Sequence, residues 1–439
     1  MKIFTLIDKI YADSILKNSM HLIVTNFLSL VLGFFFWMIA TRFYLPKEIG
    51  IISAILSSML LISTLSTIGL PSAMTFYLPI YSKDANKIIN SSLIISIIIS
   101  VIFSLIFLFG IDTWAPDLKP VLGNLELTVI FIIATIMTTV SLLMAGIFTA
   151  GKRSSFQMIK ENVFNTIKIF LLVLFAGFGA IGIFISWSVG LIASMVIGFI
   201  LLYKLWKYIP NSFNFPINSI IKDMAKFSFG VYIAGIFSNL PKLIFPILIV
   251  GMISADSAGY FFIAMTVAGI LYGIPESMVG PFIAESSDKE KFEKNIIKTI
   301  RFNLLLLIPG LILVIFFGKF VLNIFNPNYA NNSFATLIIL SMASIPTSFV
   351  VMFNMINGAQ KKIMKMIVIN IITSLSIIIL SIPLMKIWNI EGIAIAYLIT
   401  NTIMAVFIIF KTKNPMRLAI GSKGHIIKVD EIKEIDVRN

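Results

Sequence analysis

The sequence has 439 residues, of which 58% are hydrophobic and 12% are charged, and its formal net charge is +14. Soluble domains are roughly 45–50% apolar and about 25% charged, so this composition excludes a water-soluble globule and is typical of a chain that folds in a bilayer. The chain contains no cysteine and only two distant histidines, His21 and His425, so no disulfide, thiolate site or histidine-rich metal centre is expected.

The first residues predict a short interfacial segment (1–16) and not a signal peptide, because Asp8, Lys9 and Asp13 interrupt any apolar core. A spanning helix needs about 20 apolar residues, and the long apolar runs leave no polar face for a soluble amphipathic helix. We therefore predict an all-α polytopic membrane protein with about twelve spans: Met20–Phe43, Ile49–Tyr77, Ile88–Gly110, Leu125–Thr149, Met158–Gly179, Ile181–Tyr203, Phe227–Met252, Gly259–Phe282, Ile297–Gly318, Phe334–Asn357, Ile363–Leu384 and Ile390–Phe410.

The basic residues give these spans an orientation. Most of the 34 lysines and arginines lie in alternate loops, including Lys152, Arg153 and Lys160 around the start of the fifth span, and in the tail from Lys411 onward. Cytoplasmic loops of membrane proteins carry such an excess, so both termini are predicted to be cytoplasmic. This rule also explains the positive charge without nucleic-acid binding.

An internal repeat divides the chain into two parallel six-helix lobes. LPKEIG ending at Gly50 matches SADSAG ending at Gly259, and AGKR at 150–153 matches AQKK at 359–362, each 209 residues apart; GIFISW at 182–187 matches GIAIAY at 392–397, 210 residues apart. Two halves of equal orientation are typical of transporters with a cavity between them. The expected division is an N-terminal segment (1–16), a first lobe (17–206), a loop (207–219), a second lobe (220–411) and a cytoplasmic tail (412–439).

Lys242 is the strongest candidate for a residue of that cavity. It lies about ten residues from the outer end of the seventh span, roughly 15 Å deep, where a lysine does not easily reach water. Pro241 and Pro246 are expected to interrupt the helix beside it, and its repeat equivalent is Gly33. The alternative is a structural ion pair with Glu276 in the next span.

Five other residues are candidates, because ionisable groups in a membrane are costly and default to functional hypotheses. Lys168 either faces the cavity or reaches the cytoplasmic interface; Glu276 either couples an ion or pairs with a lysine. Arg42 either binds a phosphate at the outer mouth or anchors the first span at the interface. Asn26 and Asn239 either line the cavity or form hydrogen bonds between helices.

These residues favour transport of an anion. The deep charges are two cations and one anion, which suits a phosphate or pyrophosphate headgroup better than a cationic drug. The sequence has no phosphate-binding GxxxxGK[ST] loop, no HExxH and no GxSxG. We therefore expect that the protein is not an enzyme and binds no cofactor. Its energy source is expected to be something other than nucleotide hydrolysis through such a loop.

The segments FLSLVLGFFFWMIATRFYLPKEIGIISAI (27–55), NLPKLIFPILIVGMISADSAGYFFIAM (239–265) and GKFVLNIFNPNYANNSFATLIILSMASIP (318–346) carry a resemblance. They resemble the polysaccharide biosynthesis, or Wzx-type oligosaccharide flippase, branch of the multidrug/oligosaccharidyl-lipid/polysaccharide superfamily, over about Ser14–Lys411. The resemblance implies a MATE-like fold and alternating access of a cationic central cavity. It implies a lipid-linked oligosaccharide as substrate, whose polyprenyl tail stays in lipid and leaves between spans one and eight.

The resemblance further implies a multi-pass protein of the cell membrane that works among membrane lipids, with glycan-assembly enzymes as candidate partners and a monomeric chain. Three alternatives stay open. A MATE-type multidrug or cation antiporter would want acids in span one, which has none. A major-facilitator transporter would carry GxxxDRxGRR where this chain reads YSKDANK. A membrane enzyme would want a large outer loop or clustered carboxylates.

Overall fold

The structure is a computed structural model that describes residues 31–208, 219–279, 282 and 289–412. This part is built from helices and contains no strand. The first half consists of a helix at Val31–Phe43, α3 (Pro46–Ser66), α4 (Leu70–Ile80), η1 (Ser82–Asp84), α5 (Ala85–Phe109), α6 (Ile111–Trp114), η2 (Pro116–Leu118), α7 (Lys119–Leu122), α8 (Leu125–Ala150), α9 (Ser154–Leu174), η3 (Ala176–Phe178) and α10 (Gly179–Trp206). The second half consists of α11 (Ser219–Met252), α12 (Ala255–Ser277), α14 (Lys289–Phe325), α15 (Pro327–Asn332), α16 (Phe334–Ala359) and α17 (Ile363–Thr412).

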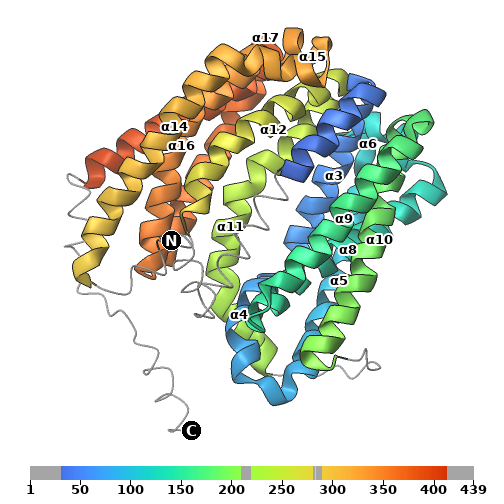
Figure 1. The fold of residues 1–439 in the computed structure, drawn as a ribbon, viewed down its shortest axis with the longest axis vertical. Coiled ribbons are helices and arrows are strands. Elements are labelled where there is room, and N and C mark those ends of the chain that lie inside the picture. Colours follow the sequence, from blue (N-terminus) through green and yellow to red (C-terminus); the bar gives the residue numbers. More distant parts are fainter. Residues whose placement is uncertain (1–30, 209–218, 280–281, 283–288, 413–439) are drawn as a thin grey trace, which may run out of the picture.

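The two halves form two groups of helices, and α11 of the second half packs against both α3 and α4 of the first. In Figure 1 the blue-to-green helices gather on the right and the yellow-to-red helices on the left, with α11 between them. Nine helices of the described part are long and apolar enough to cross a membrane, and α17 merges two helices at Trp388 and Asn389. The prediction of an all-helical membrane protein is confirmed, while the count of twelve spans and the orientation of the termini stay predictions. The segment 1–16, Asn26, most of the loop 207–219 and nearly all of the tail lie outside the described residues.

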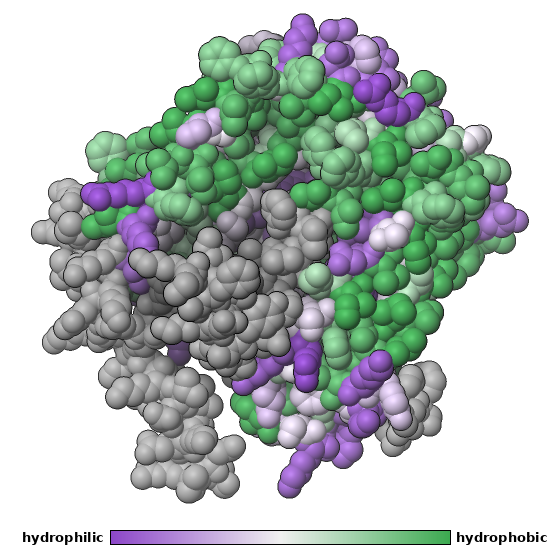
Figure 2. All heavy atoms as spheres, viewed as in Figure 1, coloured by the Kyte–Doolittle hydropathy of each residue, from purple (hydrophilic) through white to green (hydrophobic). Residues whose placement is uncertain are grey.

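The surface shows why the chain needs a bilayer. Figure 2 shows apolar residues over the flank of the molecule, with hydrophilic residues toward its upper and lower ends. Helix α5 illustrates the pattern within one helix: Ile102 and Ile106 are exposed, whereas the serines on its opposite face are fully buried, at Ser92, Ser96, Ser100 and Ser104. Small polar residues permit close helix packing, and in lipid the apolar side chains cover the outside.

The internal repeat is visible in the backbone of two equivalent turns. Lys152 follows α8 with φ of 54°, and Lys361, 209 residues later, follows α16 with φ of 56°. In the first turn the amide of Arg153 donates to the carbonyl five residues back at 3.0 Å. In the second turn the amide of Lys362 does the same at 2.8 Å. The same left-handed turn thus ends the fourth predicted span of each half.

A second pair of turns repeats at the predicted offset of 210 residues. Gly179, between α9 and α10, has φ of 56° and ψ of −146°, and Asn389 inside α17 has φ of 45° and ψ of −131°. Each turn joins the last two predicted spans of its half. The repeat therefore extends from the residue matches to the backbone, while the exact lobe boundaries stay predictions.

The left-handed backbone conformation of Lys361 predicts a small effect of substitution on stability. L-residues lose roughly 1–2 kcal/mol in this backbone region because their Cβ approaches a carbonyl, and glycine lacks that contact. We expect Lys361→Gly to raise the free energy of unfolding by about 0.5–1 kcal/mol, measured as the thermal transition in detergent. The control, Lys365→Gly inside α17, is expected to lower it by about 1 kcal/mol; a lower transition for Lys361→Gly would contradict the interpretation.

The halves touch most closely where α3 crosses α12. A β-carbon added to Gly50 would collide with the backbone of Ala255 and Gly259, and one added to Gly259 would collide with the backbone of Pro46 and Gly50. Gly50 and Gly259 are repeat equivalents, so the two halves approach each other through the same position of each. These contacts lie at the end predicted to face outside.

Candidate functional site

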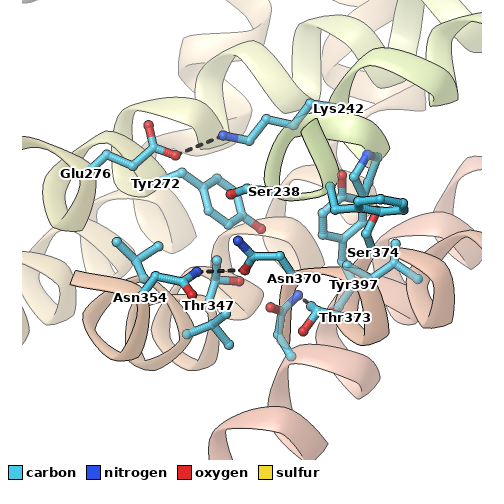
Figure 3. Close-up of a pocket in the computed structure, with 16 residues that line it drawn as sticks. Ser238, Lys242, Tyr272, Glu276, Thr347, Asn354, Asn370, Thr373, Ser374 and Tyr397 are labelled. Carbon is cyan, nitrogen blue, oxygen red and sulfur yellow. Dashed lines mark hydrogen bonds and ion pairs between the residues drawn. The ribbon is translucent and has the colours of Figure 1, made fainter. Parts of the chain in front are cut away.

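A polar pocket lies inside the second half, between α11, α12, α16 and α17. At its edge the ammonium Nζ of Lys242 lies 3.1 Å from Oε1 of Glu276. The side chain of Lys242 is 35% exposed and that of Glu276 is 55% exposed, so a ligand can reach both. Figure 3 shows the lysine reaching across from α11 to the glutamate on α12, with polar side chains of α16 and α17 nearby.

Helix α11 places Lys242 without the interruption expected from its prolines. It continues as one helix through Pro241 and Pro246, so that expectation is wrong. Each proline still lacks the amide hydrogen that would bond four residues back, which affects the carbonyls of Phe237 and Lys242. Both of these residues line the pocket. In membrane helices such freed carbonyls are tolerated where protein or a cavity surrounds them.

The rest of the pocket lining combines uncharged polar groups with apolar side chains such as Val350 and Ile377. Nδ2 of Asn354 donates to Oδ1 of Asn370 at 2.7 Å, and Nδ2 of Asn370 donates to the carbonyl of Ala234 at 2.9 Å. The hydroxyl of Tyr272 donates to the carbonyl of Leu340 at 2.8 Å. These bonds tie α11, α12, α16 and α17 together and fix the shape of the lining.

Several buried polar atoms of the same lining have no hydrogen-bond partner among the described residues: Oδ1 of Asn354, Oγ1 of Thr373, Oγ of Ser374 and the hydroxyl of Tyr397. Buried polar groups are nearly always hydrogen-bonded, and each exception asks for an explanation. Other such atoms are spread over the described helices, on α5 for example, but these four line one pocket that opens beside an ion pair, which suits a polar ligand. Sequence reasoning did not single out these residues, because single serines, threonines and asparagines occur throughout the spans.

Lys168 is far less accessible than Lys242. It lies on α9 in the first half, its residue is 4% exposed, and it does not line the pocket. Its Nζ lies over three aromatic rings, 4.8 Å from the centroid of Phe36, 4.4 Å from that of Phe164 and 4.3 Å from that of Trp187. The structure therefore brings together Lys242 and Glu276 but not Lys168.

Arg42 and Asn239 lie elsewhere. Arg42 is exposed at the end of the Val31–Phe43 helix, and its guanidinium donates to the carbonyl of Ile324 in the last turn of α14. This contact joins the two halves at the predicted outer end. Asn239 is exposed, and its Nδ2 donates to the carbonyl of Gly235 in its own helix at 3.0 Å. Neither residue lines the pocket described above.

The sequence did not predict a buried ion pair that the structure shows in the first half. Lys160, counted from its sequence position with the cytoplasmic basic residues although it falls just inside the fifth predicted span, is fully buried in α9. Its Nζ donates to the carbonyl and the hydroxyl of Ser141 on α8, the former at 3.3 Å. It also lies 3.3 Å from Oε1 of Glu161, whose side chain is 26% exposed. Lys160 does not lie in a loop, because α9 begins at Ser154, six residues earlier, and carries the lysine into the bundle.

The fold of this chain is similar to that of several solved membrane proteins. A multidrug resistance MATE family transporter of the MOP superfamily in its inward-facing conformation matches with a TM-score of 0.73 and 14% identity, covering 90% of this chain and 96% of that one. The lipid II flippase MurJ in an inward closed conformation matches with a TM-score of 0.71 and 18% identity, covering 90% and 88%. A MATE transporter of the MOP superfamily in its outward-facing conformation matches with a TM-score of 0.60 and 14% identity, covering 92% and 96%.

At these identities the solved structures show the shared fold, and a search of the curated proteins finds no significant match. The family described as "Polysaccharide biosynthesis protein" matches residues 15–285, which is more than half of the chain. The resemblance expected from the sequence is thereby confirmed. The chain is a multi-pass membrane protein with a MATE-like fold, and it belongs to the polysaccharide biosynthesis protein family.

Proposed function

We propose that the protein is a flippase that moves a lipid-linked oligosaccharide across the cell membrane, with the glycan carried on a polyprenyl pyrophosphate. The observation that carries the proposal is the half-exposed pair of Lys242 and Glu276 at the edge of a pocket with unpartnered polar groups. A long apolar tail can remain in lipid, but a charged, sugar-bearing headgroup needs a polar surface inside the protein. The family and the flippase and transporter neighbours support this function over an enzyme.

The chemistry of the pair supports an anionic headgroup. An ammonium binds phosphate oxygens through charge-assisted hydrogen bonds, but here Glu276 already holds Lys242. A pyrophosphate therefore has to compete with the carboxylate for the lysine. Uncharged hydroxyl and amide groups nearby, such as those of Thr373 and Asn354, suit the hydroxyls of a sugar.

This competition predicts opposite effects for the two partners. We expect Lys242→Ala to weaken binding of a polyprenyl-pyrophosphate oligosaccharide by about 10-fold or more, because a charge-assisted hydrogen bond contributes about 1.5–3 kcal/mol. Glu276→Gln keeps the shape but removes the competing charge, so it is expected to tighten binding. Ligand-dependent thermal stabilisation of the purified protein in detergent measures both.

The same measurement separates this function from a second one. Glu276 and the MATE transporters among the structural neighbours favour a multidrug or cation antiporter as the alternative. If the protein is such an antiporter, a hydrophobic cation should raise the thermal transition of the wild type, and this stabilisation should be lost in Glu276→Gln. Stabilisation by the cation alone, with no effect of the pyrophosphate lipid, would overturn the flippase.

Transport itself is tested in proteoliposomes. A fluorescent polyprenyl-pyrophosphate glycan in the inner leaflet should become accessible to an impermeant quencher when the wild-type protein is present, and more slowly with Lys242→Ala. Asn239→Ala is the matched control, because this side chain lies on the same helix and bonds only to Gly235 among the described contacts. A flippase of this kind is expected to act as a monomer next to glycan-assembly enzymes.

A further inference from the structure

Lys168 is a buried cation held by aromatic rings from three helices. Phe36 belongs to the Val31–Phe43 helix, Phe164 to α9 and Trp187 to α10. All three ring centroids lie within 4.8 Å of its Nζ. Within the described residues, Lys168 forms no ion pair. A desolvated cation over an aromatic face gains about 2 kcal/mol or more, so the rings take the place of a counterion.

The internal repeat shows what this site corresponds to in the second half. The equivalent of Phe36 is Phe245, 209 residues later, and the equivalent of Trp187 is Tyr397, 210 residues later. The ring centroids of Phe36 and Trp187 are 5.8 Å apart, and those of Phe245 and Tyr397 are also 5.8 Å apart. The two halves thus hold an equivalent pair of rings at the same separation, with interplanar angles of 72° and 55°.

The residue between the rings differs. The equivalent of Lys168 is Ile377, and the equivalent of Phe164 is Thr373. Ile377, Thr373 and Tyr397 all line the polar pocket of the second half. Ile377 is itself 3% exposed and belongs with Phe245 and Tyr397 to one apolar cluster, so the second half has an uncharged side chain where the first half has an ammonium.

We propose that the ammonium of Lys168 is a tethered internal cation, at a position where the second half carries the uncharged Ile377. The lysine acts as a positioning residue: its charge draws the rings of the Val31–Phe43 helix, α9 and α10 around one point. Removing the side chain beyond Cβ leaves a cage whose chemistry fits a primary alkylammonium ion. The piece removed by Lys168→Ala corresponds to n-propylammonium.

Chemical rescue tests this proposal on the purified full-length protein in detergent. We expect Lys168→Ala to lower the thermal transition and millimolar n-propylammonium to restore it by about 2–4 °C. The uncharged 1-propanol should restore it less. Wild type and Ile377→Ala, the repeat-equivalent truncation, serve as controls and should gain less from n-propylammonium than Lys168→Ala does.

Two results would overturn the proposal. Equal rescue by 1-propanol and n-propylammonium would mean that the cage only needs to be filled. If Lys168→Ala does not fold, Lys168→Met decides, because methionine keeps most of the apolar stem and removes the charge. A lower transition for Lys168→Met than for wild type supports the internal cation, and an unchanged transition contradicts it.

Discussion

A single methyl group at Gly50 is expected to disable the protein. Gly50→Ala places a carbon where the backbone carbonyl of Ala255 lies, with the backbone amide of Gly259 also too close. Overpacking typically costs 1–3 kcal/mol, and the effect here should be at least about 3 kcal/mol because backbone atoms cannot rotate away. Since the cost falls on the crossing of α3 and α12, the two halves should separate at the predicted outer end, and transport should fall sharply.

Cysteine labelling measures that separation without background, because the chain has no cysteine. Ser53 lies one turn after Gly50 on α3 and is fully buried, so residues 50 and 53 share a helix face. We expect Ser53→Cys to react slowly with a membrane-impermeant thiol reagent, and faster when Gly50→Ala is added. The rise should be largest from the outer side of the membrane.

Glycines in open space provide the control for this prediction. A β-carbon at Gly33 or at Gly269, the latter on α12 itself, meets no atom within 4 Å outside its own helix backbone and chain neighbours, among the described residues. Gly33→Ala and Gly269→Ala should leave both labelling and transport close to wild type. If Gly50→Ala behaves like these two variants, the crossing of α3 and α12 does not hold the halves together.

Two kinds of signal in the sequence predicted features of the structure: the charged residues within the spans and the internal repeat. Ionisable residues are rare in the spans, so Lys242 and Glu276 stand out, and an ion pair between them is one of the two interpretations that the sequence supports. The repeat offset located Gly50 and Gly259, and it also located the two left-handed lysines, Lys152 and Lys361. Neither kind of signal requires knowledge of side-chain packing.

The remaining features depend on packing, which periodicity does not encode. The pocket residues Asn370 and Ser374 resemble many other small polar residues of the spans, and only the arrangement of α16 against α17 brings them beside Lys242. The two prolines of α11 interrupt hydrogen bonds without breaking the helix, because neighbouring helices hold it. Lys160 lies near a loop in sequence, but the turn before α9 places it inside the bundle.

Glu161→Gln is expected to destabilise the protein much more than Lys160→Met. Lys160 is fully buried, with Ser141 and Glu161 as its polar partners, so removing the carboxylate leaves a cation without a counterion. Breaking a buried pair in this way costs about 3–5 kcal/mol, and about 3 kcal/mol is expected here since Glu161 is 26% exposed. The thermal transition in detergent is the measurement.

Substitution of Lys160 instead of Glu161 shows which of the two residues is destabilised more by the loss of its partner. Lys160→Met removes the charge and keeps the apolar stem, and Glu161 then retains water and the amide of Gln157, which donates to it at 2.8 Å. Its effect should stay below about 1.5 kcal/mol, in the range of volume-conserving core substitutions. The double variant Lys160→Met with Glu161→Gln should recover most of the loss, because well-packed uncharged residues often replace a buried pair at little cost. A double variant no more stable than Glu161→Gln alone would show that Glu161 stabilises α9 through contacts other than its charge on Lys160.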